Sequence, residues 1–419
     1  MSTQWPGGIL SKTAPTITAP TDGEGGSASG MWTMDEVLVH EKAGNWPKLL
    51  LQGGLWAWGN NSTQSGVLGV GNTTAYSSPV QVGELTTWKA MALASEWAIA
   101  TKSDGTLWTW GRNAQGQLGH GGTTVVSSPV QVGSLTTWLN IAGGGYHALA
   151  TTTGGKLYAW GDNAVGQLGD GSTTDRNAPV QIGSLTTWLR VACGYQHSLA
   201  IKTDGTLWAW GEGADGRLGD GGTTDRNSPV QIGSLTTWSK VACGLLFSTA
   251  IKTDGTLWAW GDNNDGALGD GSTTDRNSPV QIGSLTTWAE SAGGNKGQLL
   301  RKTDGTLWAV GKNDDHGEAG QSNDTSYSSP VQIGSLTTWI DIARGATSAY
   351  ALQSNGTFWA WGRNQQGQLG VGNTTSYSSP VQVGSDAWIK LPEQLTSSYS
   401  NAFAIKSVSY THLRAPRDS

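Results

Sequence analysis

Charged residues are scarce in this chain, and the positive ones never gather. Lysine, arginine, aspartate and glutamate make up 13% of the 419 residues, the formal net charge is −6, and no run of lysine or arginine occurs. Proteins that hold polyanions concentrate positive charge on one surface. We therefore expect no nucleic-acid partner.

Long apolar runs are also missing. No stretch is long enough to span a bilayer, and no apolar segment of signal-peptide length stands near the first residue. The sequence therefore predicts no membrane span, and it leaves the location open between the cytoplasm and a virus particle.

The residues that build metal, redox and catalytic sites are few. The six histidines follow no zinc-ligand spacing. Cys193 and Cys243 stand one repeat apart, which favours two small buried thiols; a disulfide would need Cα atoms within about 7 Å. "GEGADG" from Gly211 and "DNNDG" from Asp262 match a dinucleotide fingerprint and a calcium loop only in part, so we interpret both as turns. We expect no cofactor, no metal and no enzyme.

Glycine, tryptophan and repetition are what the sequence has in abundance. It contains 62 glycines and 23 tryptophans, and "KTDGTLWAWG" at residues 202–211 recurs unchanged at residues 252–261. Degraded copies precede and follow these two, which gives seven units in phase. The equivalent positions, separated by 50 to 52 residues, are Leu55, Leu107, Leu157, Leu207, Leu257, Leu307 and Phe358.

Each unit has the pattern of four short strands. In "TLWAW" the side chains alternate, so Trp208 and Trp210 are expected on one face and Leu207 on the other. "PVQIG", "LTTWLRVA" and "SLAIK" are equally short and are bounded by glycine, asparagine, serine or proline. Four strands in about 50 residues predict one blade of a β-propeller.

These phrases resemble the repeat of the regulator of chromosome condensation family, "DGxLWAWGxNxxGQLG" followed by "P" and "VAxGxxHSLAL". The resemblance spans residues 49–406. It implies an all-β fold, a seven-bladed β-propeller over residues 49–407. Residues 49–51 and residues 402–406 both match the strand that would close the ring, and the sequence leaves this choice open.

Tryptophans recur in three columns, which we expect to be buried between blades and to supply most of the bulky core. A minor alternative is that a few of these rings line a sugar-binding groove. The columns are Trp56, Trp108, Tyr158, Trp208, Trp258, Trp308 and Trp359; Trp58, Trp110, Trp160, Trp210, Trp260, Val310 and Trp361; and Trp88, Trp138, Trp188, Trp238, Trp288, Trp339 and Trp388.

The two ends of the chain lie outside the repeats. Residues 1–48 read as a flexible leader with a short helix from Thr33, where Glu36 completes a capping box, to Gly44. The leader weakly resembles segments of tailed-phage virion proteins. Residues 408–419 break the repeat and look like foreign sequence, so we exclude them from the fold.

Blades that otherwise copy each other differ most in one triplet, which follows the "VACG" phrase. Function is grafted on a fold where its copies differ, and aromatic residues are common at binding hot spots. We expect the triplets to be solvent-accessible on one face; the alternative is that they drift without consequence. The candidate binding residues are Trp97, Tyr146, His147, Tyr195, His197, Leu246 and Phe247.

A second difference lies before each "SPVQ". Three consecutive units write "TTDRN", with adjacent aspartate and arginine expected to pair, and the units around the two chain ends place a tyrosine there. In the closed ring the tyrosines would form one arc, which we interpret as a contact surface for a subunit or glycan. The alternative is that the difference has no function and that the three units with "TTDRN", whose loops we call the ionic loops, are recent duplicates. The tyrosines are Tyr76, Tyr327 and Tyr377.

The sequence therefore predicts a non-catalytic scaffold that binds a protein or glycan partner through one propeller face, with a place on a phage particle as one role. The resemblance implies two alternatives. Nuclear members of the family hold chromatin and promote nucleotide exchange on a small GTPase, for which an inserted wedge is typical, and other members inhibit enzymes. The one insertion here, near Lys390, adds about four residues.

Overall fold

The computed structural model describes residues 53–61, 65–84, 87–313, 316–395 and 400–407, and the backbone of two strands near the first residue. Residues 1–51 and 52–419 form separate units. In the first, β1 (Gln4–Trp5) and β2 (Gly8–Ile9) pair antiparallel. The helix expected from Thr33 and the tail 408–419 lie outside the described residues. No helix in the described part is long and apolar enough to cross a membrane.

Five repeats fold into separate sheets of four antiparallel strands, each strand paired with the next in the chain. The strands are β9 (Trp138–Gly143), β10 (His147–Thr152), β11 (Leu157–Gly161), β12 (Arg176–Gln181); β13 (Trp188–Cys193), β14 (His197–Lys202), β15 (Leu207–Gly211), β16 (Arg226–Gln231); β17 (Trp238–Cys243), β18 (Phe247–Lys252), β19 (Leu257–Gly261), β20 (Arg276–Gln281); β21 (Trp288–Gly293), β22 (Gly297–Lys302), β23 (Leu307–Gly311), β24 (Tyr327–Gln332); β25 (Trp339–Arg344), β26 (Ser348–Gln353), β27 (Phe358–Gly362) and β28 (Tyr377–Gln382). A 3-10 turn, η1 (Ala214–Gly216), follows β15.

Two further groups of four strands are joined in one nine-stranded sheet by a single pairing of Gly53 with Trp88, and β30 is the ninth strand, paired with β5. Their strands are β3 (Gly53–Gly59), β4 (Tyr76–Gln81), β5 (Trp88–Leu93), β6 (Trp97–Lys102), β7 (Leu107–Gly111), β8 (Val126–Gln131), β29 (Trp388–Lys390), β30 (Gln394–Leu395) and β31 (Asn401–Ser407). The described residues thus form repeated four-stranded sheets, and their pairing is consistent with seven blades.

Strands from the two ends of the repeat region complete one sheet together. β31 pairs with β3 along its whole length, from Gly53 opposite Ser407 to Gly59 opposite Asn401. β29 borders β31 and β4 borders β3, so this sheet has two strands from each end. Of the two segments that the sequence left open, the later one, residues 402–406, therefore lies in the strand that completes the sheet.

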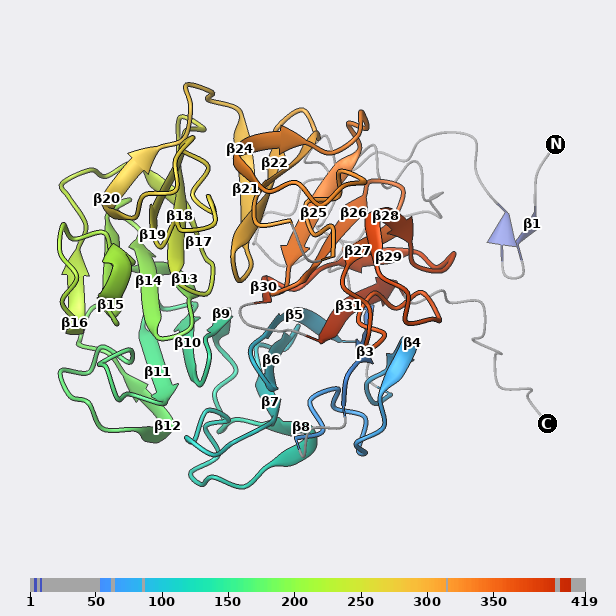
Figure 1. Cartoon of the computed structure of the whole chain (residues 1–419). Helices are drawn as coiled ribbons and strands as arrows, with labels where there is room; N and C mark the ends of the chain where they lie inside the picture. The colour runs from blue at the N-terminus through green and yellow to red at the C-terminus, as the bar shows by residue number, and fades with distance from the viewer. Residues whose placement is uncertain are drawn as a thin grey trace. The chain divides into compact units, whose positions relative to one another are not determined.

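The sheets of residues 53–407 follow one another in chain order (Figure 1). From β5 to β25, the first strand of each sheet contacts the first strand of the next. The second tryptophan column fills the space between sheets, because its six rings are fully buried. Trp210 Nε1 donates to Gln167 O of the preceding sheet at 2.9 Å. Gly169 lets this ring approach, since a Cβ there would lie 2.8 Å from Trp210 Nε1. Burial of this column between blades is confirmed.

The other two columns complete the joint. The third column is buried, and Trp188 makes edge contacts with Trp208 and Trp210 at centroid distances of 6.0 and 6.1 Å. The first column is only half-buried, so the prediction that it is buried is wrong, and Lys202 Nζ lies 3.5 Å from the Trp208 ring centroid. A cation on an aromatic face is a favourable contact. Lysine Nζ atoms lie over five of these seven rings, where a ligand would need free surface: Trp56, Trp108, Trp208, Trp258 and Trp308.

The insertion after Lys390 lies along the inner strands. Leu391 and Leu395 are fully buried, and β30 pairs in parallel with β5. β30 also contacts β21 and β25 (Figure 1). The side chain of Gln394 bonds Cys193 of β13. The segment therefore ties together inner strands of several sheets and lies within the axial space between them.

Candidate binding face

The triplet loops lie at one end of the sheets, between the first and second strand of each. Backbone hydrogen bonds link them from sheet to sheet: Gly145 N donates to Tyr195 O at 2.9 Å, and Tyr195 N donates to Leu245 O at 3.1 Å. Leu245 N in turn donates to Gly294 O at 2.9 Å. These bonds hold the loops of four successive sheets in one rigid arc.

The third residue of each triplet is not on the surface. Trp97 and Phe247 are 0% and 1% exposed, and His147 and His197 are both 0% exposed. Each of these residues is the first of the second strand, where its side chain inserts between neighbouring sheets. The prediction that these four residues are solvent-accessible is therefore wrong, and they cannot contact a partner.

The buried residues at this position bind the neighbouring sheet instead. Trp97 Nε1 donates to Gly145 O at 3.1 Å. His147 Nε2 lies 3.0 Å from Ser198 Oγ, and that hydroxyl donates to Gln167 O at 2.7 Å. Since the hydroxyl hydrogen is used, Nε2–H is the donor to Ser198 Oγ. Burial lowers the pKa of His147 to about 3, so the imidazole is neutral.

Some first and second residues of the triplets do reach the surface. Tyr146, Tyr195, Leu245 and Leu246 are half-buried side chains on three adjacent sheets, and we call them the apolar strip. The Tyr146 and Tyr195 rings meet edge to face at a centroid distance of 5.9 Å. At the outer end of the strip Arg112 Cζ lies 5.2 Å from the Tyr146 centroid and pairs with Glu96 at 2.7 Å.

A ring of residues that the sequence analysis missed lies beside these loops. The ring takes one residue from each sheet, the residue that follows the glycine at the end of the third strand. In every sheet the backbone N–H of this residue donates to the carbonyl oxygen of the second triplet residue. Asp162 N to Tyr146 O measures 2.9 Å, and Asp262 N to Leu246 O measures 3.1 Å. We call these residues the charge ring: Asn60, Arg112, Asp162, Glu212, Asp262, Lys312 and Arg363.

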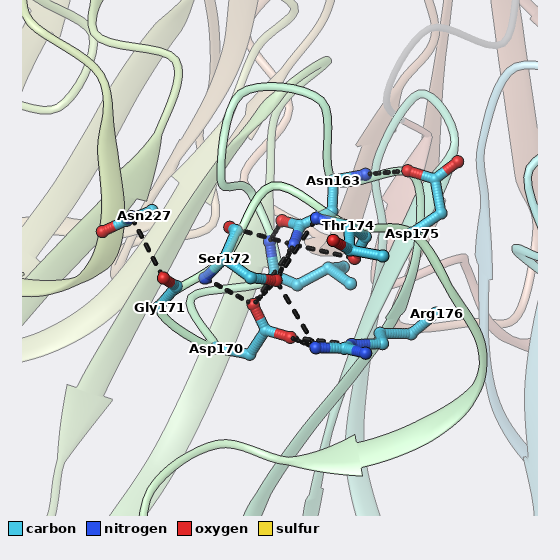
Figure 2. A network of polar contacts seen from close by, with 9 residues as sticks. Asn163, Asp170, Gly171, Ser172, Thr174, Asp175, Arg176 and Asn227 are labelled. Carbon is cyan, nitrogen blue, oxygen red and sulfur yellow. Dashed lines mark hydrogen bonds and ion pairs between the residues drawn. The ribbon is translucent and has the colours of Figure 1, made fainter.

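The ionic loops lie between the third and fourth strands, and their pairing differs from expectation (Figure 2). Arg176 pairs with Asp170 at 2.7 Å, not with adjacent Asp175. Asp175 Oδ1 instead accepts from Asn163 N at 2.8 Å, which caps the loop. Burial, which would raise the pKa of Asp170, is outweighed by hydrogen bonds from Ser172 and Arg176, so that this pKa is lowered. Arg226 and Arg276 pair with Asp220 and Asp270 in the same way.

The tyrosine loops are closed by a different set of contacts. Asn72 Nδ2 donates to the Tyr76 hydroxyl at 3.2 Å, and Asn373 Nδ2 donates to that of Tyr377 at 3.1 Å. Asn323 and Tyr327 repeat this contact, also at 3.1 Å. All three tyrosines are half-buried. They therefore keep part of each ring accessible while the hydroxyl is bonded within its own loop.

Among the described residues no group of three or more histidine, cysteine, aspartate or glutamate side chains is placed to hold a metal ion. Cys193 and Cys243 are buried and form no disulfide, as the sequence favoured, and burial raises the pKa of both thiols. A buried neutral thiol is a poor nucleophile. What the face offers is a rigid surface with apolar and charged side chains.

The repeats can be compared with known families. Residues 104–151, 154–201, 204–251, 254–298 and 355–408 match the model of the Regulator of chromosome condensation (RCC1) repeat, and these matches cover more than half of the chain. The chain belongs to the RCC1 repeat family. A second model of the RCC1 repeat matches residues 138–167, 189–217 and 238–267. A comparison with curated protein sequences finds no match for this RCC1 repeat protein.

Solved RCC1-type structures share its fold. Human WBSCR16 superposes with a TM-score of 0.74 at 22% identity, over 85% of this chain and 99% of that one. Yeast RCC1 (Prp20), solved bound to Kap60, gives 0.73 at 19% identity, over 86% and 90%. Prp20p from Saccharomyces cerevisiae, whose structure was described with its binding properties to Gsp1p and histones, gives 0.73 at 19%, over 86% and 93%. At these identities the likeness establishes the RCC1-type propeller fold.

Proposed function

We propose that this protein is a non-catalytic scaffold that binds a protein partner through the apolar strip. The observation that carries the proposal is the placing of Tyr146, Tyr195, Leu245 and Leu246 side by side on loops joined by backbone hydrogen bonds. Tyrosine is enriched at binding hot spots, and a surface that is already ordered loses little entropy on binding. A partner surface can therefore bury these side chains at low cost.

The class of partner is part of the proposal. Association with a phage particle is the role we favour, and a glycan, a small GTPase and an inhibited enzyme are the alternatives. Prp20p is described with binding properties to Gsp1p and histones, which makes a GTPase one partner to test for this chain. The net charge of −6 supports a protein partner over a nucleic acid.

The experiment compares three variants of the full chain in affinity capture. Tyr146→Ser/Tyr195→Ser/Leu246→Ser removes the strip, Tyr76→Ser/Tyr327→Ser/Tyr377→Ser removes the tyrosine arc, and Arg176→Ser/Arg226→Ser/Arg276→Ser alters the ionic loops. The baits are purified virus particles, a nucleotide-free small GTPase, secreted hydrolases and immobilised glycans. Thermal melting of each variant shows whether it is folded.

We expect capture by one protein bait, lost in the strip variant and kept in the ionic-loop variant. Loss in the tyrosine-arc variant alone would move the site to that arc and overturn the strip. Equal loss in all three folded variants, or capture by glycan only, would overturn the proposal of a protein partner on this face.

A further inference from the structure

We propose that the partner presents a cationic segment to the acidic part of the charge ring while its apolar side chains seat on the strip. This inference rests on the proposed function, because it specifies the chemistry of the surface that the strip binds. Three observations support it: the order of the charges along the ring, their place beside the strip, and the small number of described cations that pair with the carboxylates.

The charges of the ring are sorted along its circumference. Three consecutive sheets place a carboxylate at the ring position: Asp162, Glu212 and Asp262. The two sheets that follow place cations there, Lys312 and Arg363. Since strands from both ends of the repeat region share one sheet, Asn60 comes next, and Arg112 follows. The ring is thus divided into one acidic sector and one sector that is basic or neutral.

The acidic sector lies beside the apolar strip. Asp162 and Tyr146 belong to one sheet, Glu212 and Tyr195 to the next, and Asp262 and the two leucines to the third. Each sector residue bonds the backbone of the triplet in its own sheet, and Glu212 N donates to Gln196 O at 2.9 Å. A ligand that covers the strip therefore comes close to the half-buried Asp162 and Glu212, and it lies over Asp262, which is 9% exposed.

These carboxylates have too few cations around them. Asp162 accepts from the side-chain amide of Gln167 at 2.7 Å, and Asp262 accepts from that of Asn264 at 2.6 Å. Among the described residues neither pairs with a lysine or arginine. Burial and nearby carboxylates raise the pKa of both, with Asp175 near Asp162 and Asp275 near Asp262. An approaching cation would relieve this repulsion.

Glu212 has a cation, but it shares that cation with a second carboxylate. Buried Arg217 pairs with both Glu212 and Asp215, so one positive charge faces two negative ones. Asp215 also adds to the repulsion that raises the pKa of Asp262. The sector therefore keeps an excess of negative charge after its internal ion pairs are counted.

The opposite sector supplies the contrast that orients a partner. Arg363 bonds the Gln365 side chain at 2.6 Å, and no described carboxylate pairs with it. A partner with one cationic segment is attracted to the acidic side and repelled from the side of Lys312 and Arg363. Complementary charge of this kind gives specificity and a faster association. A uniformly anionic partner would meet repulsion at the strip itself.

The test uses three fluorescein-labelled peptides of twelve residues as probes, in which leucine alternates with lysine, serine or glutamate. Binding to the full chain is measured by fluorescence anisotropy at 50 and 200 mM salt. Asp162→Asn/Asp262→Asn removes two charges from the acidic sector and keeps the side-chain size. Lys312→Gln/Arg363→Gln removes two charges from the other sector and is the matched control, and melting curves confirm that both are folded.

We expect the lysine peptide to bind about tenfold more tightly than the other two at 50 mM salt, and less tightly at 200 mM. Asp162→Asn/Asp262→Asn should weaken it about fivefold and flatten the salt dependence, while the control should bind at least as well as the wild type. Equal binding of the lysine and glutamate peptides, or equal loss in both variants, would overturn the inference.

The strip variant separates this inference from the proposed function. If Tyr146→Ser/Tyr195→Ser/Leu246→Ser abolishes peptide binding and Asp162→Asn/Asp262→Asn leaves it unchanged, the strip stands and the cationic preference falls. If only the aspartate variant loses binding, the acidic sector attracts cations without the strip, and the proposed function falls.

Discussion

The side chain of Gln394 bonds both backbone groups of Cys193, 201 residues away in the chain. Its Nε2 donates to Cys193 O at 3.1 Å and its Oε1 accepts from Cys193 N at 3.2 Å. The amide thus acts as a strand partner for the buried end of β13. An insertion of a few residues thereby connects two sheets that are not neighbours in sequence.

Replacing Gln394 with alanine should destabilise the fold without changing the face. Two backbone groups of Cys193 would lose their partners, which costs about 1 to 3 kcal/mol in the free energy of unfolding. Urea denaturation measures the change. Gln382→Ala removes an exposed local bond and is the control, with an expected change within about 0.5 kcal/mol. Equal midpoints for the two variants would contradict the structural role of Gln394.

The buried histidines should make stability fall in weak acid. The unfolded chain takes up a proton on His147 near pH 6.5, whereas the folded chain does so only near pH 3, because burial lowers the pKa. Between these values the unfolded state binds more protons. The free energy of unfolding therefore decreases by about 1.4 kcal/mol per histidine for each unit by which the pH is lowered. The same direction holds for His197, because its burial and the nearby Arg217 lower its pKa.

The variant His147→Phe/His197→Phe tests this dependence, since Phe247 already fills the equivalent position one sheet later. Its loss of stability between pH 6.5 and pH 4.5, measured by urea denaturation, should be smaller than that of the wild type. Carboxylates titrate alike in both proteins, so they cancel in the comparison. Parallel pH curves would show that the imidazoles are protonated in the fold.

Trp97 and Tyr146 should behave as structural and surface residues respectively, although both belong to triplets. Trp97→Ala removes a fully buried ring and its hydrogen bond to Gly145 O, with an expected cost of about 3 to 5 kcal/mol. Tyr146→Ala removes a half-buried ring and should cost about 1 kcal/mol or less. Chemical denaturation of both variants checks the difference. A Tyr146 variant as unstable as the Trp97 variant would place the strip in the core.

The ionic and tyrosine loops should be exchangeable only as sets. Arg176→Tyr alone leaves the Asp170 carboxylate, whose side chain is 9% exposed, without its guanidinium. Asp170→Val/Ser172→Asn/Arg176→Tyr reproduces the residues around Tyr377 at these three positions. We expect the single variant to be about 1 to 2 kcal/mol less stable than the triple variant. Denaturation midpoints decide this, and a triple variant no more stable than the single one would disprove the coupling.

Repetition made the strands predictable, because seven copies in phase distinguish glycine-bounded strands from loops better than one copy can. The third triplet residue was misassigned although a signal was present. His197, Leu199 and Ile201 continue one alternating face into β14, which places His197 inside. Extending the alternation of inward and outward side chains to the first residue of each second strand would have predicted Phe247 to be buried and Leu246 to be exposed.

Contacts between segments distant in sequence were harder to predict. Asp175 and Arg176 are adjacent in the chain, but Arg176 begins β12 and its side chain reaches back to Asp170. The charge ring is legible in "GDN", "GEG", "GDN" and "GKN", yet only strand pairing places Asp162 beside Tyr146. The course of residues 391–395 could not be predicted, because a single insertion has no copy with which to compare it.

The pairing of β3 with β31 also decides when the molecule can be finished during synthesis. Gly53 meets Ser407, so the earliest strand of the sheet waits for nearly the whole repeat region to be translated. Until then β3 and β4 form a two-stranded ribbon with an open edge, which is prone to pair with other chains. The intermediate sheets can assemble locally as each repeat leaves the ribosome. The sheet shared by the two ends of the repeat region forms only when β31 pairs with β3.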